Sequence, residues 1–172
     1  MRHWALLVAV IAAVPACGGA SGGGNVPGAA ELAPTFPDPG IESFPDAGST
    51  VVPVGTDIQY STDPPTSGPH YPTPQPGGFT TAPIAPGYLV GSMASGGVVI
   101  YYDAAPITAP DLDALHLLAE AHSGDSQQVV VVPRQDPAYP IILTAWTRML
   151  PLGAFDQARI DNFVALFLGK GP

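Results

Sequence analysis

The apolar positions of this chain fall into short runs between prolines and glycines, and most of these runs predict strands. Residues 97–102 and 128–133 are rich in β-branched and aromatic side chains, which is typical of buried strands. Residues 141–147 predict a third strand. Residues 51–60 hold two shorter apolar pieces on either side of Gly55, and these predict a hairpin at a sheet edge.

Two further segments show the apolar spacing of amphipathic helices. Thr108 is suited to cap the first helix, and Asp111 is favourable in its first turn. Asp156 is suited to cap the second helix, and Gly169 to end it. The predicted apolar faces are Leu112, Leu115, Leu118 and Ala119 in the first helix, and Ile160, Phe163, Val164 and Phe167 in the second.

The order strand, helix, strand, strand, helix predicts an α+β fold, a small mixed sheet with two main helices packed on it, preceded by a proline-rich loop. That loop is residues 63–72, which contain four prolines. Proline fixes its own φ and restricts the residue before it, so this stretch cannot form a helix or a central strand. We therefore expect a stiff loop that holds His70 and Tyr71 in one place.

The N-terminal residues resemble the signal of a lipoprotein. Arg2 precedes an apolar run over residues 4–14, which is too short to span a bilayer but suits a signal peptide. Residues 14–17, Val-Pro-Ala-Cys, resemble the lipobox of bacterial lipoproteins. In those proteins the cysteine becomes the new N-terminus and carries a lipid that includes palmitate. We expect a signal peptide over residues 1–17 and lipidation at Cys17. The alternative is a plain secretory signal with an incidental cysteine.

The remaining chain divides into a tether and one domain. Residues 18–45 are rich in glycine and proline without apolar periodicity, so they predict a disordered tether. Residues 46–172 are enough for a single core. Cys17 is the one cysteine of the chain, which leaves no internal disulfide. We expect a domain outside the cytoplasm, held at the cell envelope by a lipid anchor in a bacterial membrane.

The charge of the chain narrows the range of its partners. Fourteen acidic and five basic residues give a formal net charge of −9. An acidic surface repels phosphate backbones and anionic headgroups, which argues against nucleic acid and against electrostatic membrane binding. The sequence does not specify a protein or small-molecule partner.

The proline-rich loop also carries a family resemblance. Residues 64–71, Pro-Pro-Thr-Ser-Gly-Pro-His-Tyr, resemble the signature of the bacterial family called domain of unknown function 3105. The resemblance extends over residues 41–172 and includes residues 88–90, 96–100 and 143–146. It implies a secreted or membrane-anchored protein. It implies no reaction, because the activity of the family is not established.

The chain departs from this family where chemistry is expected. After the equivalent of Leu89-Val90, members of the family resemble one another in having histidine, two further residues, glutamate, histidine and glycine. That spacing suits metal binding or acid–base work, but residues 91–96 here are Gly-Ser-Met-Ala-Ser-Gly. The family also tends to carry an upstream histidine, at about the position of Thr50. Of these groups only His70 remains, so the resemblance implies a degenerate site.

The candidate binding residues are therefore His70, Tyr71, Ser67 and Thr66, and we assign no catalytic residue, metal ligand or cofactor. A catalytic metal needs about three protein ligands, and a Ser/His pair needs a carboxylate that orients the base. An equally plain interpretation is that His70 only bonds backbone groups of the loop.

The other two histidines of the predicted domain offer no second site. His116 and His122 are six residues apart and do not share a helical face, so we interpret them as an exposed residue and a helix-end charge. Aromatic residues such as Tyr101, Tyr102 and Trp146 are expected in the core rather than in a ligand platform.

Two function classes stay open. One is a tethered binding or structural module without catalysis. The other is a metal-binding protein or hydrolase centred on His70, with Asp103 or another acid brought near by folding.

Overall fold

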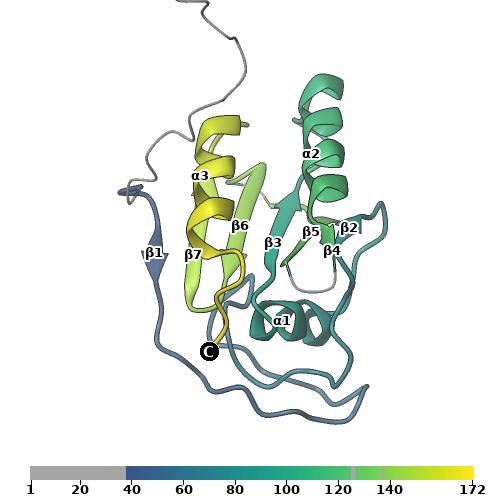
Figure 1. Cartoon of the computed structure of the whole chain (residues 1–172), viewed down its shortest axis with the longest axis vertical. Coiled ribbons are helices and arrows are strands. Elements are labelled where there is room, and N and C mark those ends of the chain that lie inside the picture. The colour runs from purple at the N-terminus through teal and green to yellow at the C-terminus, as the bar shows by residue number, and fades with distance from the viewer. Residues whose placement is uncertain (1–37, 125–126, 137) are drawn as a thin grey trace, which may run out of the picture. The chain divides into compact units, whose positions relative to one another are not determined.

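A computed structural model describes residues 38–124, 127–136 and 138–172 of the chain. It has a mixed sheet with helices on both faces (Figure 1), which confirms the predicted α+β class. Cys17, the predicted signal peptide and most of the predicted tether lie outside the described residues. Within the described part, no helix is both long and apolar enough to cross a membrane.

The centre of the sheet is a parallel pair. β3 (Val98–Tyr102) runs parallel to β5 (Gln127–Pro133) on one side and antiparallel to β6 (Ile141–Ala145) on the other. The full order is β1 (Glu42–Ser43), β7 (Arg148–Leu152), β6, β3, β5 and β2 (Gly78–Phe79), with β4 (Ser123–Gly124) paired to β5. The parallel arrangement of β3 and β5 means that both strands end at the same edge of the sheet.

The helices cover the two faces unequally. α2 (Ala109–Ala121) and α3 (Gln157–Phe167) stand side by side on one face, where Leu115 and Phe163 are fully buried (Figure 1). α1 (Pro86–Ala94) and the long proline-rich segment before it cover the other face, where Met93 packs with Tyr101 and Trp146. Both faces of the central strands are therefore buried, as their continuous apolar sequences predict.

The predicted starts of α2 and α3 and the predicted end of α3 are confirmed. The Thr108 side chain accepts a hydrogen bond from Asp111 N at the start of α2, and Asp156 Oδ1 accepts one from Arg159 N at the start of α3. Gly169 follows the last turn of α3 with φ +80°, a conformation that favours glycine.

Two predicted features are wrong or incomplete, and one helix was not predicted. Residues 51–60 form no hairpin; Val51 instead makes an isolated parallel bridge to His70. The strand predicted over residues 141–147 ends at Ala145, because Thr147 has φ 59° and reverses the chain into β7. α1 was not predicted at all, since glycines at positions 87 and 91 interrupt its pattern.

Residues before position 46, the predicted start of the domain, already contact the sheet and α3. Arg159 Nε and Nη2 donate to the two carboxylate oxygens of Asp38 at 2.6 and 2.9 Å. Glu42 and Ser43 then pair with β7. This segment is thus joined both to α3 and to the edge of the sheet.

Candidate functional site

The proline-rich motif lies directly on α1. His70 N donates to Thr50 O at 3.0 Å, and Tyr71 N donates to Gly87 O at 3.0 Å. Further along, Ser92 Oγ of α1 donates to Gln75 O at 2.7 Å. The segment is extended, as its prolines require, and its backbone groups bond to α1 and to the segment around Thr50 rather than to a sheet.

Two glycines of α1 permit this close approach. Gly87 and Gly91 are four residues apart and so lie on one face of the helix. A Cβ on Gly87 would lie 2.7 Å from the Tyr71 ring, and a Cβ on Gly91 would lie 3.3 Å from Tyr71 O and 3.6 Å from His70 Cδ2. The same glycines that obscure α1 in the sequence therefore seat the motif on it.

Thr66 and Ser67, the two hydroxyl-bearing residues of the motif, form hydrogen bonds to neighbouring loops. Ser67 Oγ accepts from Ala47 N at 3.1 Å, and Thr66 N donates to Thr62 Oγ1 at 3.1 Å. Thr66 O accepts from Thr147 N in the turn between β6 and β7. Thr66 and Ser67 are both buried. Their polar groups are thus used inside the protein.

His70 is 8% exposed, and its Nδ1 lies 3.2 Å from Gly68 O. Within the described part of the chain, its ring bonds neither a carboxylate nor another imidazole. Asp103, the acid considered as its partner, accepts instead from Ala105 N in its own turn. No group of three histidine, cysteine or acidic side chains among the described residues could hold a metal ion.

The tyrosines near His70 also form hydrogen bonds within the fold. Tyr71 Oη donates to Thr56 O at 3.2 Å, and its ring packs edge-on against Tyr88. Tyr60 Oη donates to Pro69 O at 2.9 Å, and burial raises the pKa of this phenol to about 12. The four candidate residues 66, 67, 70 and 71 are therefore close together, but each has a structural role.

The two other histidines in the described part of the chain lie elsewhere. His116 is exposed on α2 and stacks on Phe79 with a ring separation of 3.5 Å. His122 is the C-terminal cap residue of α2. Neither residue approaches His70 to complete a site.

The structure has a cavity of about 830 Å³ at the carboxyl ends of β3 and β5. Its walls come from the ends of these strands and the loops after them, from residues 63 and 65 of the motif, and from the segment that enters α1. Ile84, Leu89 and Val132 supply apolar surface, as do several prolines. In open α/β sheets the carboxyl ends of parallel strands are the usual place for ligands.

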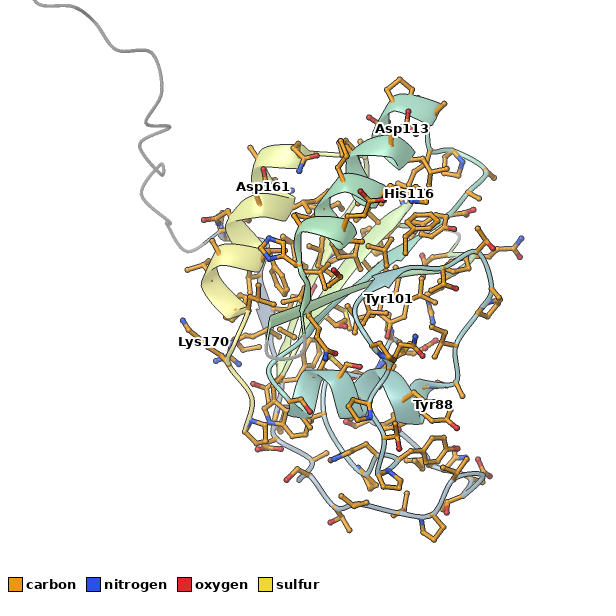
Figure 2. The ribbon with its side chains drawn as sticks, turned by 45° about the vertical axis from the view of Figure 1, so that its right-hand side comes forward. Tyr88, Tyr101, Asp113, His116, Asp161 and Lys170 are labelled. Carbon is orange, nitrogen blue, oxygen red and sulfur yellow. The ribbon has the colours of Figure 1, made fainter. Side chains whose placement is uncertain are left out.

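Tyr101 Oη and Arg134 Nε, two polar atoms of residues that line this cavity, are shielded from solvent and form no hydrogen bond of good geometry. Tyr101 is 5% exposed and lies among the interior side chains in Figure 2. The buried Thr144 hydroxyl lies beside Tyr101 Oη, and hydrogen bonding between the two side chains lowers the pKa of Tyr101 against the larger effect of burial. Burial raises the pKa of Tyr101, so its hydroxyl keeps its proton.

Arg134 joins the cavity to the motif. Its Nη1 and Nη2 each donate to a carboxylate oxygen of Asp63 at 3.0 Å, and Asp136 lies 3.7 Å from Nη2. The hydrogen bond to Asp63 raises the pKa of the guanidinium further above its usual range. The guanidinium carbon also lies 6.0 Å from the centre of the Tyr101 ring.

The sequence interpretation missed this site because it concentrated on histidine. Tyr101 was placed in the core, which is confirmed, but it also lines the cavity. A usable signal was present: Asp103 and Arg134 directly follow the two predicted strands that a helix connects. Two such strands run parallel, so polar residues after them gather at one edge.

Comparisons with known proteins agree with the resemblance seen in the motif. The family model described as "Protein of unknown function (DUF3105)" matches residues 52–172. No curated protein matches the chain, and no solved structure does. The match includes the motif, α1 and the whole sheet except β1. The chain therefore belongs to the DUF3105 family of proteins of unknown function.

Proposed function

We propose that this protein is a lipid-anchored, extracytoplasmic binding module that takes a small molecule in the cavity at the carboxyl ends of β3 and β5. The observation that carries the proposal is a cavity of about 830 Å³ with mainly apolar walls and with Asp63, Asp103 and Arg134 among its lining residues. Small-molecule sites typically have this size, with mainly apolar walls and a few polar groups.

A binding role fits the motif better than catalysis does. A serine nucleophile needs a base within hydrogen-bond reach, and the base needs a group that orients it. Ser67 Oγ is bonded to the segment at Pro45 and Ala47, and His70 Nδ1 faces Gly68 O. These contacts support a motif that shapes the fold and, through Asp63 and Pro65, one wall of the cavity.

The surroundings of His70 support a degenerate family site. Thr50 O accepts from His70 N, and a Cβ on Gly91 would lie 3.6 Å from His70 Cδ2. Positions 50 and 91 are where the family resemblance implies histidines. Histidine side chains at both positions would begin close to His70. Thr50 and Gly91, which stand there in this chain, supply no imidazole.

Metal titration tests the degenerate site. With zinc added to the metal-free chain, we expect no micromolar binding by calorimetry, since affinity comes from several ligands together. The triple variant Gly91→His, Ala94→Glu and Ser95→His should gain binding, and His70→Ala should abolish that gain. Micromolar binding by the unmodified chain that His70→Ala removes would instead support the metalloprotein or hydrolase alternative.

The cavity is tested by blocking it. Ala105 is exposed at the cavity, so Ala105→Trp should fill its entrance without disturbing the core. Ala158→Trp is the matched control, because Ala158 is exposed on α3 and does not line the cavity. The full chain with Cys17→Ser is screened against neutral and charged small molecules by ligand-observed NMR. Binding that persists in the Ala105→Trp variant would contradict the proposed site.

The anchor is tested separately. We expect mass spectrometry of membrane fractions to show a lipidated N-terminal peptide that begins at Cys17. Cys17→Ser should release the protein from the membrane. An unmodified Cys17 in a soluble secreted form would leave the plain secretory signal as the correct interpretation.

A further inference from the structure

We propose that the cavity at the carboxyl ends of β3 and β5 binds an organic cation, a protonated amine attached to an apolar group, and that Asp103 pairs with the amine. This inference rests on the proposed binding function and specifies its ligand class. Two observations carry it. One is a solvent-accessible oxygen of Asp103 to which no described residue donates, and the other is an excess of acid among the charged residues of the cavity.

Asp103 directly follows β3 and lines the cavity. Its Oδ1 accepts a hydrogen bond from Ala105 N at 3.0 Å, which closes the turn after the strand. Its Oδ2 is open to solvent, and no described residue donates a hydrogen bond to it. Within the described part of the chain, no lysine, arginine or histidine forms an ion pair with this carboxylate. Asp103 therefore presents an uncompensated negative charge at the cavity wall.

Arg134 does not neutralise Asp103, although the two residues are close along the backbone ladder. Arg134 N donates to the carbonyl oxygen of Tyr102, the residue before Asp103, at 2.8 Å. The guanidinium instead bonds both carboxylate oxygens of Asp63 at 3.0 Å and lies 3.7 Å from Asp136. Two carboxylates thus compensate one arginine, and the charge of Asp103 remains.

The loss of water from Asp103 favours a cation over an uncharged ligand. A molecule that fills the cavity displaces the water that solvates the accessible oxygen of Asp103. A carboxylate that loses this water without gaining a partner is costly, because a charge inside a protein is stable only when it is paired or hydrogen-bonded. A protonated amine supplies both hydrogen-bond donors and an opposite charge, so it replaces the lost water.

The same charges disfavour an anion and a metal ion. An anionic ligand would meet Asp63 and Asp103 together, and both Nη atoms of Arg134 are already bonded to Asp63. A metal ion needs several protein ligands, and no group of three histidine, cysteine or acidic side chains in the described ranges could hold one. The formal net charge of −9 also attracts cations to the chain rather than anions.

The walls of the cavity describe the other part of the ligand. Ile84 and Leu89 come from α1 and the segment before it, and Val132 comes from the end of β5. Four prolines add rigid apolar surface: Pro65, Pro83, Pro86 and Pro133. Rigid walls lose little entropy when a ligand binds. A small inorganic cation would leave this surface unused, whereas an amine on an aromatic or alkyl group covers it.

The test uses probes that separate the charge from the apolar group. Phenethylamine, 2-phenylethanol and 3-phenylpropanoate share one phenylethyl group and are a cation, a neutral molecule and an anion at neutral pH. Methylammonium has the charge without the apolar group. Their dissociation constants are measured by NMR titration of the full chain carrying Cys17→Ser. We expect phenethylamine to bind at least about tenfold more tightly than each of the other three probes.

A conservative variant tests the role of Asp103. Asp103→Asn removes the charge but keeps the turn, because the amide oxygen still accepts from Ala105 N. This variant should weaken phenethylamine binding at least about tenfold and change the affinity for 2-phenylethanol by less than about twofold.

Asp113→Asn is the matched control, because it removes the same charge from the chain at an exposed position of α2 that does not line the cavity (Figure 2). It should leave the affinity for phenethylamine within about twofold of its original value. Unchanged phenethylamine binding by the Asp103→Asn variant would contradict the pairing with Asp103. The comparison of the four probes does not depend on the folding of either variant.

The outcomes separate the inference from the proposed function. If 2-phenylethanol or 3-phenylpropanoate binds as tightly as phenethylamine, and Ala105→Trp blocks this binding, the cavity is a binding site and the cation inference is wrong. If methylammonium binds as tightly as phenethylamine, the apolar part of the inference is wrong. If no probe shifts any resonance of a cavity residue at millimolar concentration, both the inference and the proposed site fail.

Discussion

Replacing Gly87 by alanine tests whether the proline-rich motif depends on close contact with α1. A Cβ at this position would lie 2.7, 2.8 and 2.9 Å from three atoms of the Tyr71 ring, well inside van der Waals contact. The ring has little room to move, because its hydroxyl donates to Thr56 O and its edge packs against Tyr88.

The expected magnitude follows from two opposing effects. Alanine in place of glycine favours a helix by at most about 1 kcal/mol, and by less in the first turn. Overpacking a well-filled contact costs about 1–3 kcal/mol. We therefore expect Gly87→Ala to lower the free energy of unfolding by about 1–2 kcal/mol.

Denaturant unfolding measures this change, and a matched glycine provides the control. A Cβ on Gly153 would have no atom within 4 Å, so Gly153→Ala should change the free energy of unfolding by less than about 0.5 kcal/mol. In a Tyr71→Ala background, Gly87→Ala should become neutral or stabilising, because the ring is gone. An equal effect of Gly87→Ala in both backgrounds would refute the reasoning, as would stabilisation in the unmodified protein.

Three other predictions concern the core, pH and the cavity. Phe163→Ala should lower the free energy of unfolding by about 3–5 kcal/mol, measured with denaturant, since the ring is fully buried. Leu117→Ala, at a 67% exposed position, is the control and should lower it by less than about 0.5 kcal/mol. A loss under about 1 kcal/mol for Phe163→Ala would show that α3 is peripheral. The hydrogen bond from Arg159 lowers the pKa of Asp38 below its ordinary 3.8, so the pair stabilises the fold above about pH 4 and loses that stability as pH falls through the lowered pKa. Asp38→Asn should therefore make the free energy of unfolding less dependent on pH in this acid range. An unchanged pH dependence would contradict the role of the pair. Tyr101→Phe without ligand should leave the free energy of unfolding unchanged or raise it by about 1 kcal/mol, because it removes a buried hydroxyl without a partner, and a loss above 1 would mean that the hydroxyl is bonded inside the fold.

Much of the secondary structure could be predicted because its causes are local. The valine run of β5 and the Thr108 and Asp156 caps act within a few residues of chain, so the sequence alone indicates them. The motif could likewise be predicted as an irregular segment, because each proline restricts its own backbone and that of its neighbour.

The missed elements depend on contacts between distant residues. α1 contains Pro86, Gly87 and Gly91, and it is stabilised by the burial of Leu89, Val90 and Met93 against the sheet. Its glycines are unfavourable for an isolated helix. They are useful only because Tyr71 packs on them, and the sequence around α1 does not reveal that contact.

The amino-acid sequence by itself determined the α+β class, the ends of two helices, the central strands and the rigidity of the motif. Only the tertiary structure decided that the motif is used mainly for packing, and that Asp63, Tyr101 and Arg134 border one cavity. The reason is physical: backbone preference and apolar periodicity act over a few residues, whereas a cavity forms where segments far apart in the chain meet. Asp63 and Arg134 lie 71 residues apart, and folding alone brings them within 3.0 Å.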